Sequence, residues 1–255
     1  MSTPQGTFAE LARTGGRGAL VTVLDGPSPG AKLLVGADRA TQGSLGAAAL
    51  DAAAVELAEA LMWSERSERH QVGEVTLFVD VTFPPPRLFV FGAVDFAASL
   101  CRIARATGWR PFVVDPRKRF AQPARFPDAE GVVAAWPEEA FAQLGGIDRA
   151  TAIAVLTHDP KLDDAALILA LASDASYIGA MGSRRAQASR RERLLAQGVA
   201  EDALARVSAP IGLDLGALTA EETALSIMAE IVAMRYGRDG GRLANAKGRI
   251  HEVGV

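Results

Sequence analysis

The stretch Thr151–Arg185 decides the fold, and it reads TAIAVLTHDPKLDDAALILALASDASYIGAMGSRR. Ala152–Leu156 is a short apolar run rich in strand-forming residues, which is typical of a buried parallel strand. Asp159 and Pro160 come next; Asp caps helices, and Pro fits the first helical position because its missing N–H would be unpaired there. A second apolar run, Tyr177–Ala180, precedes another helix. The stretch therefore predicts a βαβ unit.

Polar residues follow both of these strands. Open α/β sheets hold ligands at the carboxyl ends of their strands, so we expect ligand-binding side chains at these two turns. His158 is a candidate base or hydrogen-bond donor, or it merely packs. Asp159 caps the helix and is also a candidate site residue. Asp163 and Asp164, in the first turn of the helix, favour it through the helix dipole.

The turn after the second strand has the composition of an anion site. Free backbone N–H groups, a hydroxyl and two guanidinium groups would meet there at a helix start. The alternative is a solvated helix cap with two surface arginines. The residues concerned are Gly182, Ser183, Arg184 and Arg185.

Composition indicates an ordinary globular protein. The 255 residues suffice for one large domain or two modest ones, and 49% are hydrophobic and 22% charged. The net charge of −3 does not indicate the positively charged surface that binding to nucleic acid or to an anionic membrane requires. No apolar run is long enough to span a membrane and no signal peptide is evident, so we expect a cytoplasmic protein.

Metal-ligand spacing is also missing from the sequence. The single cysteine, Cys101, excludes an intramolecular disulfide and lies in an expected helix, where a core position is favoured over a nucleophile. The three histidines, His70, His158 and His251, are scattered along the chain. We therefore predict no structural metal site.

The proline triplet Pro84-Pro85-Pro86 marks the domain boundary, because such a run is stiff and extended. Residues 1–83 are expected to form a smaller α+β domain and residues 87–255 a Rossmann-like domain with a parallel sheet, so the fold class is α/β. In the first domain we expect a hairpin of two strands, a loop, a helix and an alternating strand, at Ala19–Leu24, Ala31–Val35, Gln42–Gly46, Ala47–Glu65 and Val75–Phe83.

The turn after the first strand of the second domain resembles a broken dinucleotide fingerprint. That fingerprint needs glycines at its first, third and sixth positions. Gly92 fits the first, but Val94 fills the third, and Asp95 places a negative charge where phosphate would bind. Asp115, after the next strand, stands where an acidic ribose ligand is expected. An NAD(P) site and a Rossmann domain without dinucleotide binding both remain open.

A glycine-rich loop, PIGLDLGA, precedes the last helix. Asp214 in this loop is either a turn former or a site carboxylate facing the sheet edge. The helix that follows, Thr219–Tyr236, begins with a capping box formed by Thr219 and Glu222.

Taken together, the motifs resemble the XdhC/CoxI family, accessory proteins for the maturation of molybdenum hydroxylases such as xanthine dehydrogenase and carbon monoxide dehydrogenase. The motifs occur in the family's order and cover most of the chain. They are PGAKLLV (Pro29–Val35), GSLG (Gly43–Gly46), DPRKRFAQPARFPDA (Asp115–Ala129), LTHDPKLDDAAL (Leu156–Leu167), YIGAMGSRR (Tyr177–Arg185) and PIGLDLGALTAEETALSIMAEI (Pro210–Ile231).

The resemblance implies a small N-terminal domain joined to a Rossmann-type domain, in a homodimer. It implies an accessory protein that binds the molybdenum cofactor, assists its sulfuration and hands it to the apo-hydroxylase, with a cysteine desulfurase as a further partner. A pterin cofactor carries a phosphate, for which Ser183, Arg184 and Arg185 are the expected contacts. The ring would then lie near His158 and Asp214.

Two departures from the family pattern concern ligand-facing positions. The family continues after GSLG with two glycines and a cysteine, whereas this chain has alanines at 47–49. The family also shows Gly-His where this chain has Val94-Asp95. Three functions therefore compete: a cofactor-binding maturation factor, a divergent paralogue that acts by protein contact alone, and an NAD(P)-dependent oxidoreductase.

Overall fold

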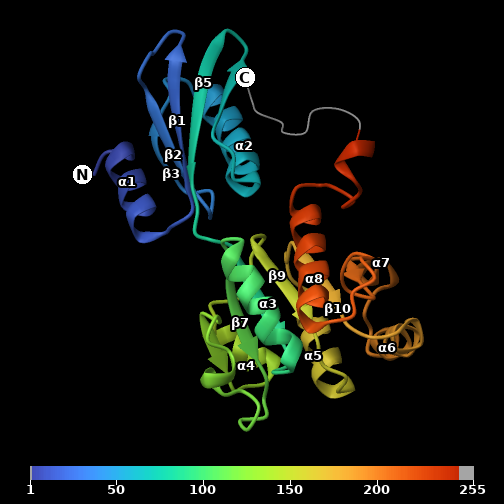
Figure 1. Cartoon of the computed structure of the whole chain (residues 1–255). Coiled ribbons are helices and arrows are strands. Elements are labelled where there is room, and N and C mark those ends of the chain that lie inside the picture. Colours follow the sequence, from blue (N-terminus) through green and yellow to red (C-terminus); the bar gives the residue numbers. More distant parts are fainter. Residues whose placement is uncertain (1, 247–255) are drawn as a thin grey trace. The chain divides into compact units, whose positions relative to one another are not determined.

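The computed structural model describes residues 2–246, and the chain divides into two compact units between Pro85 and Pro86 (Figure 1). Each unit has its own hydrophobic core. We propose that the two units are the domains predicted on either side of the proline triplet.

The N-terminal unit is built on a five-stranded antiparallel sheet with the order β3-β2-β1-β5-β4. Helix α2 packs on this sheet, and its apolar face meets the inward side chains of the strands. The predicted hairpin, β1 with β2, is confirmed. The elements are α1 (Pro4–Thr14), β1 (Gly18–Asp25), β2 (Lys32–Gly36), β3 (Thr41–Ser44), α2 (Ala48–Ser64), β4 (Glu68–Val72) and β5 (Val75–Thr82).

Two strands of this unit differ from the sequence-based expectation. Thr41–Ser44, within and beside the expected loop, is a strand paired with β2. Glu68–Val72, not expected to be a strand, pairs with β5. Both are edge strands with no buried residue, so neither carries the apolar pattern that marks a central strand.

The C-terminal unit has six parallel strands in the order β11-β10-β9-β6-β7-β8. Counted along the chain from β6, this is the Rossmann order 3-2-1-4-5-6, so the predicted fold class is confirmed. The elements are β6 (Arg87–Phe91), α3 (Asp95–Ala106), β7 (Arg110–Val114), β8 (Gly131–Val133), α4 (Pro137–Gln143), β9 (Thr151–Val155), α5 (Pro160–Leu171), β10 (Tyr177–Ala180), α6 (Arg184–Ala196), α7 (Glu201–Leu204), β11 (Val207–Ser208) and α8 (Ala220–Arg235), with short 3₁₀ turns at Pro123–Arg125 and Leu243–Asn245.

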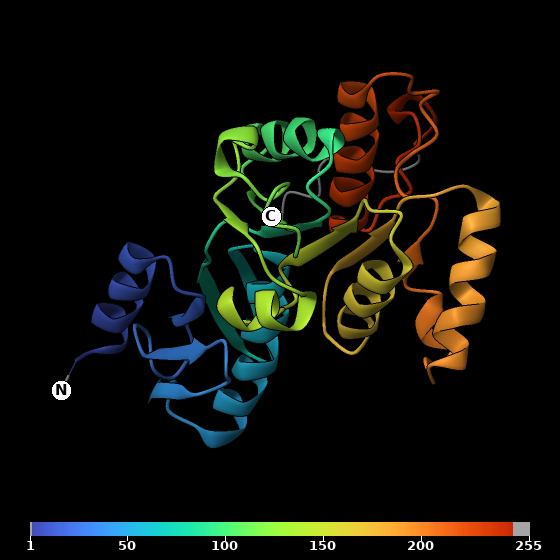
Figure 2. The same ribbon diagram turned by 90° about the horizontal axis from the view of Figure 1, so that it is seen from below.

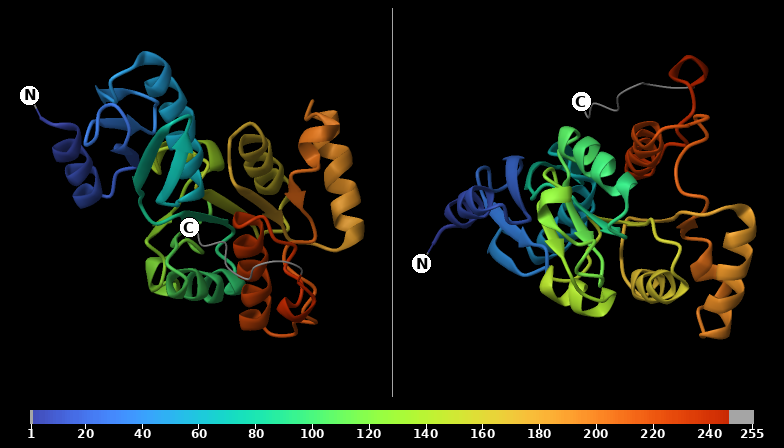
Figure 3. Two further views of the ribbon diagram at one scale, coloured as in Figure 1. Left: turned by 90° about the horizontal axis from the view of Figure 1, so that it is seen from above. Right: turned by 60° about the horizontal axis from the view of Figure 1, so that its bottom comes forward.

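Helices cover both faces of the parallel sheet. In Figure 2, α3 and α8 lie above the sheet, and α4 and α5 lie below it. Figure 3 shows α3 and α8 side by side in both views. Because the sheet is covered twice, all five residues of β9 are buried, which explains its continuous apolar run.

β6 and β9 are parallel, hydrogen-bonded neighbours, and the direction in which successive strands are added to the sheet reverses between them. β7 and β8 extend the sheet on one side of this pair, and β10 and β11 extend it on the other. Ligands of doubly wound sheets bind in the crevice outside the carboxyl ends of the strands at such a switch point. The turns that follow β6, β7, β9 and β10 therefore define the candidate site.

The helices within residues 2–246 differ from membrane-spanning helices. None of them combines the length and the apolar character needed to cross a bilayer.

Candidate functional site

The turn after β6 depends on Gly92. Its φ is +111°, and a Cβ atom there would lie 2.9 Å from Thr157 Cγ2 and 3.2 Å from the Thr157 backbone nitrogen. Glycine therefore allows the β6–α3 turn to lie directly against the end of β9. Val94 precedes α3 as its N-cap and forms no side-chain capping bond.

Asp115 lies at the end of β7, fully buried. Oδ2 accepts hydrogen bonds from the Ala93 backbone N–H (2.9 Å) and Arg117 Nη2 (2.7 Å), and Oδ1 accepts from Arg117 Nε (2.8 Å). Burial by itself would raise the pKa of Asp115, but the hydrogen bonds from Arg117 and Ala93 hold it below its ordinary value. The carboxylate thus joins the ends of β6 and β7 and has no exposed surface to offer a ribose hydroxyl.

The N-terminus of α3 carries a negative charge. The Asp95 side chain is 95% exposed, and its Oδ1 accepts a hydrogen bond from Arg125 Nη2 at 3.2 Å. Arg125 Nη1 also donates to the Ala93 carbonyl at 3.0 Å, which fixes the arginine beside the turn. The carboxylate stands where a Rossmann protein binds the pyrophosphate of a dinucleotide, and it disfavours that ligand.

The turn after β9 has the predicted helix cap. Asp159 Oδ1 accepts a hydrogen bond from the Lys161 backbone N–H at 3.0 Å, and Pro160 is the first residue of α5. His158, between β9 and the cap, is exposed. Hydrogen bonding to Asp115 and, more weakly, the charge of Asp159 raise the pKa of Arg117, so the ends of β7 and β9 share one electrostatic environment.

A buried ion pair joins the turns after β9 and β10. Thr157 Oγ1 donates to Asp163 Oδ1 at 2.8 Å, and Arg190 Nη2 donates to Asp163 Oδ2 at 2.8 Å. The same Arg190 nitrogen donates to the Met181 carbonyl at 3.0 Å. Asp163 lies in the first turn of α5, as expected, but only 2% of the residue is exposed, so its carboxylate also has a buried partner.

The sequence held a signal for this inward position. Asp163 lies on the same helical face as Leu167 and Ala170, which are both buried. A carboxylate on an apolar face needs a buried partner. That partner, Arg190, lies 27 positions further along the chain and is visible only in the fold.

The turn after β10 presents two unpaired cations. Ser183 caps α6, since its Oγ accepts a hydrogen bond from the Ala186 backbone N–H at 3.3 Å. Gln187 Nε2 donates to the Gly182 carbonyl at 3.2 Å and steadies the turn. Arg184 and Arg185 are exposed and form no hydrogen bond or ion pair with any residue in 2–246. The geometry leaves both guanidinium groups available to an anion.

The glycine-rich loop crosses the end of β10. The Ile211 N–H donates to the Ala180 carbonyl at 3.1 Å, and the Gly212 N–H donates to Glu230 Oε2 at 2.8 Å. Tyr177 donates to the same Glu230 oxygen, and burial, followed by this carboxylate, raises the pKa of Tyr177. Asp214, further along the loop, is exposed.

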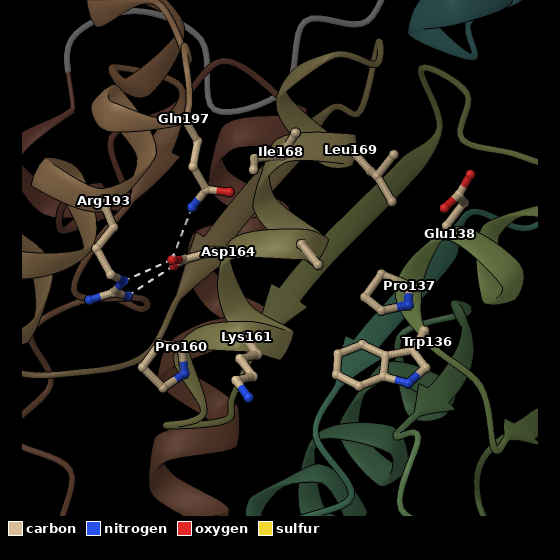
Figure 4. Close-up of a pocket in the computed structure, with 11 residues that line it drawn as sticks. Trp136, Pro137, Glu138, Pro160, Lys161, Asp164, Ile168, Leu169, Arg193 and Gln197 are labelled. Atoms are coloured by element: carbon tan, nitrogen blue, oxygen red, sulfur yellow. Dashed lines mark hydrogen bonds and ion pairs between the residues drawn. The ribbon is translucent and has the colours of Figure 1, made fainter.

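A groove of about 730 Å³ lies elsewhere in this unit, against α4, α5 and α6 (Figure 4). Its wall includes Trp136, Lys161 and Ile168, and an ion pair in which Arg193 Nε donates to Asp164 Oδ2 at 2.7 Å. It comes within one residue of Asp159 along the chain, but none of the predicted site residues lines it.

The single thiol lies away from the four strand-end turns, in the core that α3 forms with the sheet. Cys101 is fully buried in α3, and burial, with a smaller contribution from Asp128, raises the pKa of its thiol to about 12. Within residues 2–246, no three side chains of His, Cys, Asp or Glu form a group suited to a metal ion. His251 lies outside the described residues.

Comparison with known proteins identifies both parts of the chain. Residues 88–231 match the XdhC Rossmann domain, and residues 11–73 match the XdhC and CoxI family. A protein of Bacillus subtilis described as a probable xanthine dehydrogenase component is 31% identical over 62% of this chain and 46% of its own length. The molybdenum cofactor insertion chaperone PaoD of Escherichia coli is 28% identical over 61% of this chain and 42% of its own length. This chain thus spans less than half of each relative.

A crystal structure described as a xanthine dehydrogenase from Bacillus halodurans has the same fold. The TM-score is 0.62 at 22% sequence identity, over 91% of this chain and 66% of the other. The Rossmann match alone spans more than half of the sequence and contains every one of the four strand-end turns. The chain belongs to the XdhC and CoxI family.

Proposed function

We propose that this chain is an accessory protein that binds the molybdenum cofactor and assists its insertion into a molybdenum hydroxylase of the xanthine dehydrogenase or carbon monoxide dehydrogenase type. Family membership supports the proposal, as does the relative described as a molybdenum cofactor insertion chaperone. Homodimerisation is proposed on the same ground.

The observation that carries the proposal is the pair of unpaired guanidinium groups after β10. Arg184 and Arg185 stand at the start of α6, beside the backbone N–H groups of a capped helix terminus. Such a group of donors suits a phosphate monoester, and the pterin cofactor carries one. The exposed side chains of His158 and Asp214, from the neighbouring turn and loop, are the proposed contacts of the pterin ring.

Sulfur chemistry fits this chain less well than phosphate binding. A thiol that is buried and has a raised pKa is neither a metal ligand nor a sulfur carrier, and Cys101 is the only thiol in the sequence. We propose that a cysteine desulfurase supplies the sulfur while this protein holds the cofactor by its phosphate and ring. The chemistry of sulfuration would then take place on groups of the partner protein.

Reconstitution of an apo-hydroxylase tests the proposal. Apo-enzyme is mixed with isolated molybdenum cofactor, with or without this protein, and recovered hydroxylase activity is measured. We expect this protein to raise the yield, and the Arg184→Ala, Arg185→Ala variant to remove most of the gain. The Arg13→Ala variant, which loses an exposed charge from α1, should behave as wild type. Equal yields with and without the protein would contradict the proposal.

A protein-contact function is the second candidate. The exposed alanines at positions 47–49, at the start of α2, stand where the family has glycines and a cysteine, so this unit lacks the thiol a cofactor would meet. In that case the protein would bind the hydroxylase directly and raise the yield equally with and without Arg184 and Arg185. An NAD(P)-dependent oxidoreductase is disfavoured by the exposed Asp95 carboxylate at the start of α3.

A further inference from the structure

Exposed apolar side chains gather on α8 and on the segments beside it. Six of the nine large hydrophobic residues that are exposed within residues 2–246 lie between positions 215 and 243, so they are concentrated rather than scattered. They are Leu215, Leu218, Leu225, Met234, Tyr236 and Leu243. Single exposed apolar residues are normal on a protein surface, whereas a concentration of them marks an interaction surface.

Helix α8 has three faces, and two of them are covered within its own unit. The first face is buried against α3, which lies beside α8 (Figure 3), and against the sheet. It carries Ala224, Ile227, Met228 and Ile231. The glycine-rich loop covers the second face, because Ser226 Oγ donates to the Leu213 carbonyl and the Gly212 N–H donates to Glu230 Oε2. These contacts leave the third face of the helix.

The third face carries a stripe of residues at heptad spacing. Its members are Leu218, Glu222, Leu225, Ala229, Val232 and Tyr236, separated by alternating intervals of four and three positions. We call these six residues the α8 stripe. Leu218 is 94% exposed, Leu225 51% and Tyr236 65%, and only Glu222 is polar. Alternating apolar intervals of three and four are the pattern by which one helix packs along another.

Leu218 shows that the stripe lacks a partner within the described part of the chain. It directly precedes Thr219, the N-cap of α8. A hydrophobic residue at this place often packs on the fourth residue of its own helix. In α8 that residue is Thr223, which is polar, and Leu218 stays almost fully exposed. Its side chain is therefore available to another molecule.

The charges of α8 make this surface complementary to itself. The helix begins with Glu221 and Glu222, and it ends with Arg235, with Arg238 three positions further on. Two copies of α8 that run antiparallel place the acidic start of each helix beside the basic end of the other, and their dipoles are also favourably opposed. A contact across a two-fold axis needs a surface that fits itself in this way.

The spacing of the stripe also fits an antiparallel pair. If the two-fold axis passes the middle of the stripe, Leu218 of one copy faces Tyr236 of the other, and Leu225 faces Ala229. A large side chain then meets a small one at the centre, which lets the two helices interdigitate. Glu222 faces Val232, and a single polar residue in such a seam specifies the register at some cost in stability.

We propose that the α8 stripe is a dimer interface, in which α8 packs antiparallel on α8 of a second copy of this chain. The proposal assigns a surface to the homodimer proposed above. It goes beyond cofactor binding, because it stands on the exposure, spacing and charge of α8. Its test contains no cofactor, so a failure here would leave the claim about Arg184 and Arg185 untouched.

Sedimentation equilibrium of the full chain, at about 1 to 100 µM, measures the dimer dissociation constant. We expect a wild-type dimer that Leu225→Glu weakens at least about a hundredfold, because a two-fold interface contains the change twice and each change buries an unpaired carboxylate. Leu24→Glu is the matched control, since Leu24 in the N-terminal unit is 50% exposed, and it should dimerise as wild type. Leu218→Glu, at a more exposed position, should weaken the dimer as Leu225→Glu does.

Disulfide trapping tests the direction of the helices. Leu218→Cys and Tyr236→Cys proteins are mixed and oxidised, and the buried Cys101 does not compete. An antiparallel pair should give at least about tenfold more mixed disulfide than either variant forms with itself. Circular dichroism should show that all the variants unfold close to the wild-type temperature, because each changes an exposed side chain.

Four results would overturn the proposal. The first is a wild-type protein that stays monomeric at about 100 µM. The second is a dimer that neither Leu225→Glu nor Leu218→Glu weakens, because the interface would then lie elsewhere. The third is equal weakening by Leu24→Glu, and the fourth is a predominance of disulfides between identical variants. A monomer whose binding to the purified hydroxylase is lost in Leu225→Glu would assign the stripe to that enzyme instead of a second copy.

Discussion

The one thiol of the chain limits what this protein does to sulfur. Cys101 belongs to the core that α3 forms with the sheet, and its pKa of about 12 keeps it protonated at neutral pH. A protonated, buried thiol reacts neither with a disulfide reagent nor with a persulfide donor, because the thiolate is the nucleophile.

We therefore predict that Cys101 is inert in the folded protein. Ellman's reagent should label less than a tenth of the native protein in the time that fully labels the protein in guanidinium chloride. Incubation with a cysteine desulfurase and cysteine should leave no persulfide on the chain, as judged by mass spectrometry. Rapid labelling of the native protein would show that the thiol is accessible and would reopen a sulfur-carrier role.

Asp115 holds the ends of β6 and β7 together at the candidate site, and we predict that it also stabilises the folded protein. Asp115→Asn leaves Arg117 without its ionic partner and should lower the free energy of unfolding by about 2–4 kcal/mol. Asp174→Asn, an exposed residue of the same unit, should change it by less than about 0.5 kcal/mol. Urea denaturation measures both, and equal effects would contradict the assigned role.

The contribution of Asp115 to the free energy of unfolding depends on pH, because the pKa of its carboxyl group is shifted in the folded protein. The pKa of Asp115 is lower in the folded protein than in the unfolded chain, so its contribution is present above the ordinary carboxyl pKa of about 3.9. The contribution is lost as the pH falls through the lower, folded value. The difference in stability between wild type and Asp115→Asn should therefore narrow in acid.

At the scale of elements, the ion pair between Asp163 of α5 and Arg190 of α6 holds together the turns after β9 and β10, which carry the proposed cofactor contacts. Asp163→Leu and Arg190→Met should each cost about 3–5 kcal/mol, since each leaves a buried charge unpaired. The double variant should cost much less than the two single changes together. Urea denaturation of all four proteins gives the coupling, and simple additivity would show that the two side chains act independently.

Most elements were predictable because the central strands of the Rossmann unit are buried on both faces. Their continuous apolar runs, and caps such as Asp159 and Thr219, give local signals that the fold preserves. Such signals are missing from four short or peripheral elements. They are the edge strands β3 and β4, the short helix α7 and the two-residue strand β11. Their structure depends on partners elsewhere in the chain.

The candidate site divides in the same way. Polar residues after strands were sufficient to predict that His158 and Arg184 belong to the carboxyl edge of the sheet. The sequence did not predict that Asp115 is buried, because its carboxylate accepts a hydrogen bond from the backbone N–H of Ala93, which no sequence pattern encodes. It did not predict the pairing of Asp163 with Arg190, because these two residues are distant in the sequence.

At the scale of the whole molecule, the chain is predicted to contain two independent folding units. Residues 1–85 and 86–255, produced separately, should each show cooperative thermal unfolding by circular dichroism, because each contains a complete sheet and core. A break between Thr107 and Gly108 provides the control, since it removes β6 and α3 from the parallel sheet. If the fragments of the first pair are unfolded alone, the units depend on each other for stability.

Equilibrium binding of isolated molybdenum cofactor to the purified protein tests the central claim most directly. We predict binding that Arg184→Ala, Arg185→Ala weakens at least tenfold, that Arg13→Ala leaves intact, and that NADP does not displace. Absence of binding by the wild-type protein, or equal binding by the double variant, would contradict this claim. The first result would favour a function through protein contacts alone. The second would show that the cofactor binds at a place other than the turn after β10.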